Sequence, residues 1–94
     1  MEKQYWVYML TNRSHKVLYI GSTSNLQQRV AQHKQKAMGG FTAKYNINKL
    51  IYFESTNDAY AAVSRERQLK GWTRKKKNWL INSLNPEWEE LSVE

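Results

Sequence analysis

Two apolar runs near the start of the chain, WVYML at residues 6–10 and VLYIG at residues 17–21, decide its fold. The stretch between them is polar and rich in residues that favour turns. Two such runs joined by a short polar link predict an antiparallel β-hairpin. If the turn centres on Arg13 and Ser14, Tyr8 lies directly opposite Tyr19, with the two Cβ atoms roughly 4.5–5.5 Å apart. The tyrosines are then either ordinary half-buried strand residues or a pair of hydroxyls that handles protons or contacts phosphate.

The remaining pattern predicts three helices and one more strand. Ser24 and Gln27 form a capping box for a helix that continues to about Lys36. The core-facing positions expected on this helix are Leu26, Val30 and Ala37. Gly39 and Gly40 follow it and predict a flexible loop.

Residues 48–54 predict the third strand, and residues 59–70 predict a second helix, capped at Asn57-Asp58 and ended by Gly71. Thr73 caps a third helix through about Leu84, with apolar side chains available for packing at Trp79, Leu80 and Leu84. The acidic tail, about residues 87–94, either packs through Trp88 and Leu91 or frays. These elements predict an α+β fold.

Length and composition favour one folded domain, residues 1–94. The chain has no cysteine, which excludes disulfides and thiolate metal sites. No apolar run approaches the ~20 residues that span a membrane, and the first residues lack the features of a signal peptide. We therefore expect a cytoplasmic protein without a membrane partner.

The net charge of +7 is concentrated in residues 65–77, where seven basic residues and one acidic residue, Glu66, account for +6. Such a block either is a solvated helix face or attracts polyanions, because bound Lys and Arg release counterions from a phosphate backbone. The clustering favours nucleic acid. The block lacks the apolar stripe of a membrane-surface helix.

Glu66 itself lies on the apolar stripe of the second helix, between Val63 and Leu69. A carboxylate is costly to bury unless it is paired or binds a metal ion. Glu66 is therefore either a rim residue paired with Lys70, one turn later, or a hard oxygen ligand for Mg²⁺.

Asn25, Arg29 and His33 recur every four residues and form a polar row on the first helix. Arg29 is either a surface residue or a guanidinium that leans over the hairpin and grips phosphate. His33 is either an ordinary helical histidine or a group that transfers a proton or contacts a nucleic-acid backbone.

Taken together, these residues resemble the GIY-YIG nuclease family. The YIG signature is intact at residues 19–21, whereas WVY at residues 6–8 stands where GIY would be. The likeness continues through GSTSNL at residues 21–26 to Arg29, His33 and Glu66. The chain looks most like the small stand-alone members grouped as an uncharacterised protein family, UPF0213. The resemblance implies a small three-stranded antiparallel sheet flanked by about three helices.

For chemistry, the resemblance implies phosphodiester hydrolysis that depends on Mg²⁺ or Mn²⁺, with DNA expected more than RNA. Glu66 would hold the metal ion, Arg29 would stabilise phosphate charge, and Tyr8 and Tyr19 would activate or orient the attacking water. His33 would assist proton transfer, and Gly21 would be structural. The candidate nucleic-acid contacts are Lys44, Tyr45, Arg65, Lys70, Arg74, Lys75, Lys76 and Lys77.

Two departures from the family pattern bear on the site. The missing Gly-Ile changes strand packing around Tyr8, and a late asparagine of the family has several counterparts here: Asn78, Asn82, Asn85 or, in the aligned place, Glu89. Two alternatives stay open: a nucleic-acid-binding module that retains the fold without cleaving, and a protein-interaction domain. We expect a monomer and leave open a protein partner that adds specificity.

Overall fold

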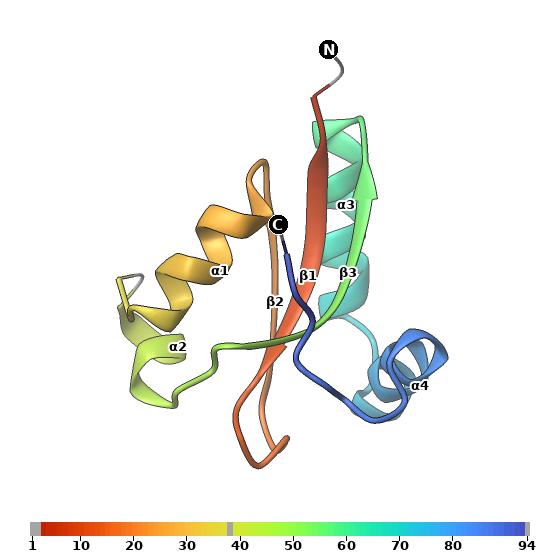
Figure 1. Cartoon of the computed structure of the whole chain (residues 1–94). Helices are drawn as coiled ribbons and strands as arrows, with labels where there is room; N and C mark the ends of the chain where they lie inside the picture. Colours follow the sequence, from red (N-terminus) through yellow and green to blue (C-terminus); the bar gives the residue numbers. More distant parts are fainter. Residues whose placement is uncertain (1–2, 38, 94) are drawn as a thin grey trace.

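The computed structural model describes residues 3–37 and 39–93 (Figure 1). The elements are, in chain order, β1 (Tyr5–Thr11), β2 (Leu18–Thr23), α1 (Leu26–Lys34), α2 (Gly40–Lys44), β3 (Lys49–Thr56), α3 (Ala59–Lys70) and α4 (Arg74–Leu84). The three strands form one antiparallel sheet in the order β2-β1-β3. The predicted α+β class and three-stranded sheet are confirmed, and β2 is an edge strand.

The register of the β1–β2 hairpin differs from the predicted one by two residues. Tyr8 lies opposite Gly21, and Tyr19 lies opposite Leu10, so the predicted Tyr8–Tyr19 pair is wrong. The cause is the loop, where the Asn12 side chain accepts hydrogen bonds from the backbone N–H groups of residues 16 and 17, and residue 15 has a positive φ. A two-residue shift preserves the face of every side chain. Tyr8 and Tyr19 therefore remain on one face as diagonal neighbours.

Both faces of the sheet are covered (Figure 1). On one face, strand residues pack with α3 and α4 in a buried cluster of Val7, Met9, Ile20, Ile51, Tyr52, Ala62, Leu69, Ile81 and Trp88. On the other face, α1 completes a second cluster of Tyr8, Leu10, Leu26, Val30, Ile47 and Leu50. The final residues cross this second face, where Leu91 donates its backbone N–H to Leu50. Of the two predicted behaviours of the tail, packing through Trp88 and Leu91 is the one observed.

The helix boundaries follow their capping residues. Asp58 and Thr73 cap α3 and α4 as predicted, and Gly71 ends α3. At α1 the cap is Asn25, whose side chain accepts from the backbone of Gln28, rather than the predicted Ser24.

Three apolar residues that were expected to face the core or to be available for packing are exposed. Helix α1 ends at Lys34 rather than near Lys36, which leaves Ala37 in solvent. On α4 the fully buried residue is Ile81, whereas Trp79 and Leu84 are 63% and 67% exposed. Leu80 is partly buried against the core, as predicted. The sheet therefore buries a different stripe of α4 from the one expected.

The segment after α1 contains a helix that the sequence did not predict. Helix α2 begins at Gly40, in the region expected to be a flexible loop. Gly39 has φ 63° and ψ −166°, a backbone conformation that essentially only glycine adopts. Through the described ranges, every helix is too short or too polar to cross a membrane.

Candidate active site

The centre of the candidate site is the crossing of Tyr8 over Gly21. The two residues pair across β1 and β2, and a Cβ atom built on Gly21 would lie 2.5 Å from the Tyr8 hydroxyl and 2.6 Å from its Cζ. The Tyr8 ring therefore occupies the space where a side chain at position 21 would be. Only glycine leaves room for the Tyr8 ring at this position, and the Tyr8 hydroxyl therefore lies over the edge strand β2.

The Tyr8 hydroxyl meets His33 of α1. Tyr8 and His33 are both buried, and the hydroxyl is 3.2 Å from His33 Nε2. The other ring nitrogen, Nδ1, is 3.2 Å from the Thr42 hydroxyl of α2. A neutral imidazole has one donor and one acceptor nitrogen, so His33 can satisfy both partners without a charge. His33 thus lies in the core stripe rather than in the predicted polar row beside it.

Tyr19 and Arg29 complete this side of the site. The Tyr19 ring is 6.3 Å from that of Tyr8 and 5.5 Å from that of His33, measured between centroids. Burial, reinforced by Tyr19 and Glu66, raises the pKa of Tyr8 to about 12, although the nearby Arg29 guanidinium acts in the opposite direction. Burial and the Arg29 charge both lower the pKa of His33. At neutral pH, Tyr8 is therefore protonated and His33 is neutral beside a permanent cation.

Glu66 approaches from the other face of the sheet. Its Oε1 accepts a hydrogen bond of 2.5 Å from the Ser22 hydroxyl, and its Oε2 is 2.6 Å from Lys70 Nζ. Burial raises the pKa of Glu66, but the bonds from Lys70 and Ser22 outweigh it and hold the pKa below its ordinary value. The rim pairing with Lys70 is therefore present, and the same carboxylate is also bonded to the edge strand beside Gly21.

The Glu66 carboxylate suits a divalent ion whose remaining ligands are water molecules and substrate phosphate oxygens. Across residues 3–37 and 39–93, no three His, Asp or Glu side chains gather into a metal-binding group. Glu66 is ionised, only 19% of its side chain is exposed, and its two oxygens keep acceptor capacity beyond their present contacts. Mg²⁺ commonly binds through one or two carboxylates, several waters and substrate phosphate.

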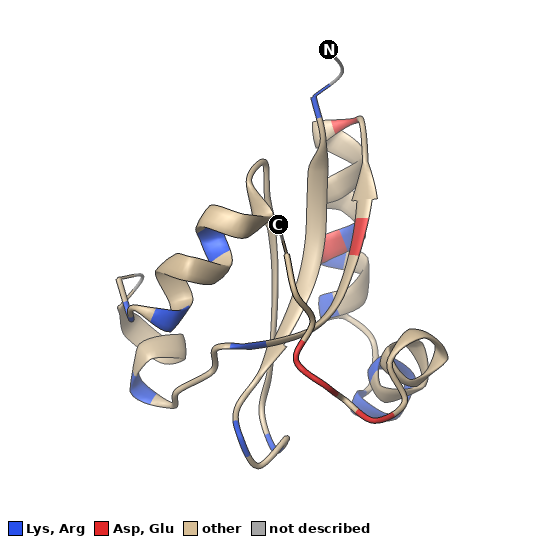
Figure 2. Cartoon of the chain, viewed as in Figure 1, with Lys and Arg blue, Asp and Glu red and all other residues tan. Residues whose placement is uncertain are grey.

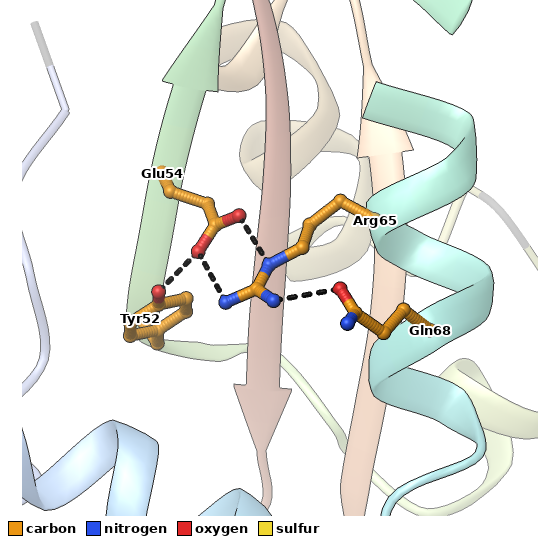
Figure 3. A network of polar contacts seen from close by, with 4 residues as sticks. All are labelled: Tyr52, Glu54, Arg65 and Gln68. Atoms are coloured by element: carbon orange, nitrogen blue, oxygen red, sulfur yellow. Dashed lines mark hydrogen bonds and ion pairs between the residues drawn. The ribbon is translucent and has the colours of Figure 1, made fainter. Parts of the chain in front are cut away.

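Arg65, predicted to contact nucleic acid, is occupied within the protein. Figure 3 shows its guanidinium between Glu54 of β3 and Gln68 of α3. Tyr52 donates its hydroxyl to the same Glu54 carboxylate, and the Arg65 guanidinium also lies 5.3 Å from the centroid of the Trp72 ring. This network joins α3 to β3, and we assign Arg65 to the fold rather than to the nucleic-acid surface.

Arg74 is likewise engaged, because it donates to the backbone carbonyls of His15 and Lys16 in the hairpin loop. Lys75 and Lys76 are exposed on α4, and Lys77 is half-buried. Lys44 at the end of α2 and Tyr45 directly after it are exposed. Figure 2 shows Lys and Arg on α1, α2, the hairpin loop and α4, so the basic surface is wider than the predicted block.

The three late asparagines have partners in α4, in β3 and in the segment that follows α4. Asn78 accepts from Arg74, Asn82 accepts from the Trp88 indole, and the buried Asn85 donates to the carbonyls of Ile51 and Glu89. Glu89, the other candidate, is an exposed residue of the tail. These contacts give the asparagines structural roles.

Sequence reasoning missed two residues of the site, Ser22 and Thr42. Strand alternation places Ser22 on the face opposite Tyr19 and Gly21, where α3 packs, and that signal was available. Thr42 belongs to α2, whose position depends on the path of the chain after α1, and no local pattern marks it.

Comparison with known proteins identifies the family of the chain. The profile of the GIY-YIG catalytic domain matches residues 4–78. The UPF0213 protein of Clostridium perfringens is 34% identical over 89 residues, which are 95% of this chain and 95% of that protein. A UPF0213 protein of Syntrophus aciditrophicus is 36% identical over 91 residues, covering 93% of this chain and 98% of that protein.

A solved structure shows a similar fold. The solution NMR structure of the UPF0213 protein BH0048 from Bacillus halodurans superposes with a TM-score of 0.59 at 21% identity, and the likeness covers 93% of this chain and 92% of that one. The domain profile spans most of the chain. Both relatives are UPF0213 proteins, and the match covers nearly the full length of each. This protein therefore belongs to the GIY-YIG family, among its small UPF0213 members.

Proposed function

We propose that this protein is a divalent-metal-dependent nuclease that hydrolyses phosphodiester bonds in DNA. Membership of the GIY-YIG family indicates nuclease-type function. One observation supports the finer proposal: five side chains from four elements meet around residues 21 and 22 of the edge strand. They are Tyr8, Tyr19, Arg29, His33 and Glu66.

The charges suit a phosphate. Hydrolysis adds negative charge to an anionic group, and preorganised cations and hydrogen-bond donors stabilise that charge most effectively where water is excluded. The Arg29 guanidinium supplies a permanent positive charge beside the Tyr8 hydroxyl. Glu66 would hold Mg²⁺ or Mn²⁺, which when bound supplies Lewis-acid stabilisation of phosphate charge.

The proton chemistry favours different duties for the two tyrosines. A phenol with a pKa of about 12 is a poor base at neutral pH, so Tyr8 acts as a hydrogen-bond donor that orients water or phosphate oxygen. When His33 donates from Nε2 to the Tyr8 oxygen, the Tyr8 proton is left for this role, so His33 would position Tyr8. Tyr19 is half-buried, which leaves it more accessible to a water molecule than Tyr8.

The test is an incubation of the purified chain with single-stranded, duplex and branched DNA, and with RNA, in Mg²⁺, Mn²⁺ or EDTA. We expect metal-dependent cleavage that Glu66→Ala, Arg29→Ala and Tyr8→Phe each reduce about 10²-fold or more. Glu87→Ala, at an exposed glutamate outside every candidate set, is the matched control and should cleave normally. Cleavage that persists equally in Glu66→Ala would indicate a contaminant. Binding without cleavage on every substrate would favour the non-catalytic module.

A further inference from the structure

Helix α2 and the residue that caps its end present two aromatic rings to solvent beside the candidate site. Phe41 is 53% exposed and Tyr45 is 45% exposed, and their ring centroids are 5.0 Å apart at an interplanar angle of 55°. Exposed aromatic area is costly in water unless a partner covers it. The pair therefore forms an apolar surface suited to a planar ligand.

This surface is fixed to the site by neighbouring residues. Thr42, between the two aromatic positions, is bonded to His33, the imidazole that contacts Tyr8. A cavity of about 160 Å³ is lined by Tyr19, His33, Gly39, Phe41 and Thr42. It is smaller than the ~300–1,000 Å³ of pockets for drug-sized ligands and suits a single planar ring. Phe41 and the candidate active site thus line the same hollow.

Charge beside the rings points to a nucleotide as the ligand. Lys44 Nζ lies 5.3 Å from the Tyr45 ring centroid, and the chain carries a net charge of +7. Aromatic side chains next to basic groups bind single-stranded nucleic acid, because every base has a face that can stack while its phosphate meets a cation. In a duplex these faces are covered by neighbouring bases, so the ring surface can be used only by an unpaired base.

We propose that Phe41 and Tyr45 form a stacking platform for an unpaired nucleobase, with Lys44 contacting its phosphate. The platform shares its hollow with Tyr19 and His33 of the candidate site, so the base would lie close to a phosphate bound by Arg29 and by a metal ion on Glu66. The substrate is therefore DNA with a single-stranded nucleotide at the cleavage position. The substrate assignment rests on the proposed nuclease function, whereas the binding platform can be tested without cleavage.

The experiment measures binding of the full chain to a single-stranded oligonucleotide that contains 2-aminopurine, in EDTA so that cleavage does not interfere. Stacking of this fluorescent base on a ring changes its emission. Phe41→Ala and Tyr45→Ala should each weaken binding about fivefold or more and reduce the emission change. Phe41→Tyr and Tyr45→Phe should retain both. Affinity for the fully paired duplex should stay within twofold.

Tyr60→Ala and Trp79→Ala are matched controls, because these aromatics are 79% and 63% exposed on other helices. Equal losses in the controls, equal losses on duplex, or unchanged emission in the α2 variants would overturn the platform. If the binding and emission results are as expected but no substrate is cleaved, the nuclease proposal alone is refuted. Metal-dependent cleavage with unaltered binding in both α2 variants would refute the platform alone.

Discussion

Replacing Gly21 with alanine tests the geometry on which the site depends. The new methyl group would lie 2.5 Å from the Tyr8 hydroxyl, whereas ordinary contacts begin near 3.4 Å, so the atoms must separate by about 0.9 Å. Tyr8 has no free space to yield, because its side chain is fully buried and its hydroxyl is bonded to His33. Overpacking of this kind costs about 1–3 kcal/mol.

The same displacement should disable the site. A misplacement near 1 Å can reduce catalysis about 10²-fold, so we expect Gly21→Ala to lose cleavage while remaining folded. Thermal unfolding should show Tm lowered by about 4–8 °C for each kcal/mol lost. Gly71→Ala is the matched control, since its added methyl would meet its nearest atom at 3.5 Å and φ is −82°. It should be neutral or slightly stabilising.

A double-mutant cycle identifies the cause. Tyr8→Leu removes the ring atoms and hydroxyl that the alanine methyl would strike, so Gly21→Ala should cost much less stability in that background. An undiminished cost in the Tyr8→Leu protein, or a Gly21→Ala protein as stable as the wild type, would refute the steric argument.

Four further outcomes follow from the contacts. Tyr8→Phe should lower the free energy of unfolding by about 1–3 kcal/mol in denaturant titrations, because it leaves a buried His33 nitrogen without its partner. The pKa of His33 is lowered in the folded state, so the stability that neutral His33 contributes is present above the unfolded pKa of 6.5 and is lost as pH falls. An NMR titration of the His33 ring should give a midpoint below 6.5. A midpoint at or above 6.5 would contradict the burial argument. The pKa of Glu66 is also lowered, so the wild type should be more stable than Glu66→Gln by its full margin above pH 4.5, the ordinary pKa. This margin should shrink as pH falls through the folded pKa of Glu66. Thermal melts that show a margin independent of pH would contradict the ion pairing of Glu66. Arg65→Ala should lower the free energy of unfolding by about 1 kcal/mol or less and leave DNA affinity unchanged. Lys75→Ala, at an exposed residue, should weaken DNA binding and reduce its salt dependence in fluorescence titrations. The reverse result would assign Arg65 to the nucleic-acid surface.

Local chemistry explains what the sequence could predict about the fold. The bounds of α3 follow from Asp58 and Gly71, which satisfy the helix ends within a few residues of chain. The two faces of the hairpin follow from alternation, which survives a two-residue shift. The register itself was not predictable from apolar pattern alone, since it is set by the Asn12 side chain folding back on the loop.

In the candidate site, the burial of His33 could be predicted from the sequence, whereas its hydrogen-bond partners could not. Leu26, Val30 and His33 are spaced four and three residues apart, so the core stripe of α1 already included His33, although its polarity suggested a polar row beside that stripe. The partners of that histidine come from β1 and from α2. Only the tertiary path of the chain brings those elements together, and helical periodicity carries no information about it.

The edge position of β2 brings residues from both faces of the sheet to one place, as the proposed function requires. Gly21 and Ser22 are consecutive and therefore face opposite sides of the strand. Tyr8 crosses over the first from the α1 side, and Glu66 bonds the second from the α3 side. On a central strand, neighbouring strands would separate these two groups. At an edge strand, nothing in the sheet lies beyond residues 21 and 22, so under the proposed function a phosphate against that edge would meet the cation of Arg29 on one side and a metal ion held by Glu66 on the other.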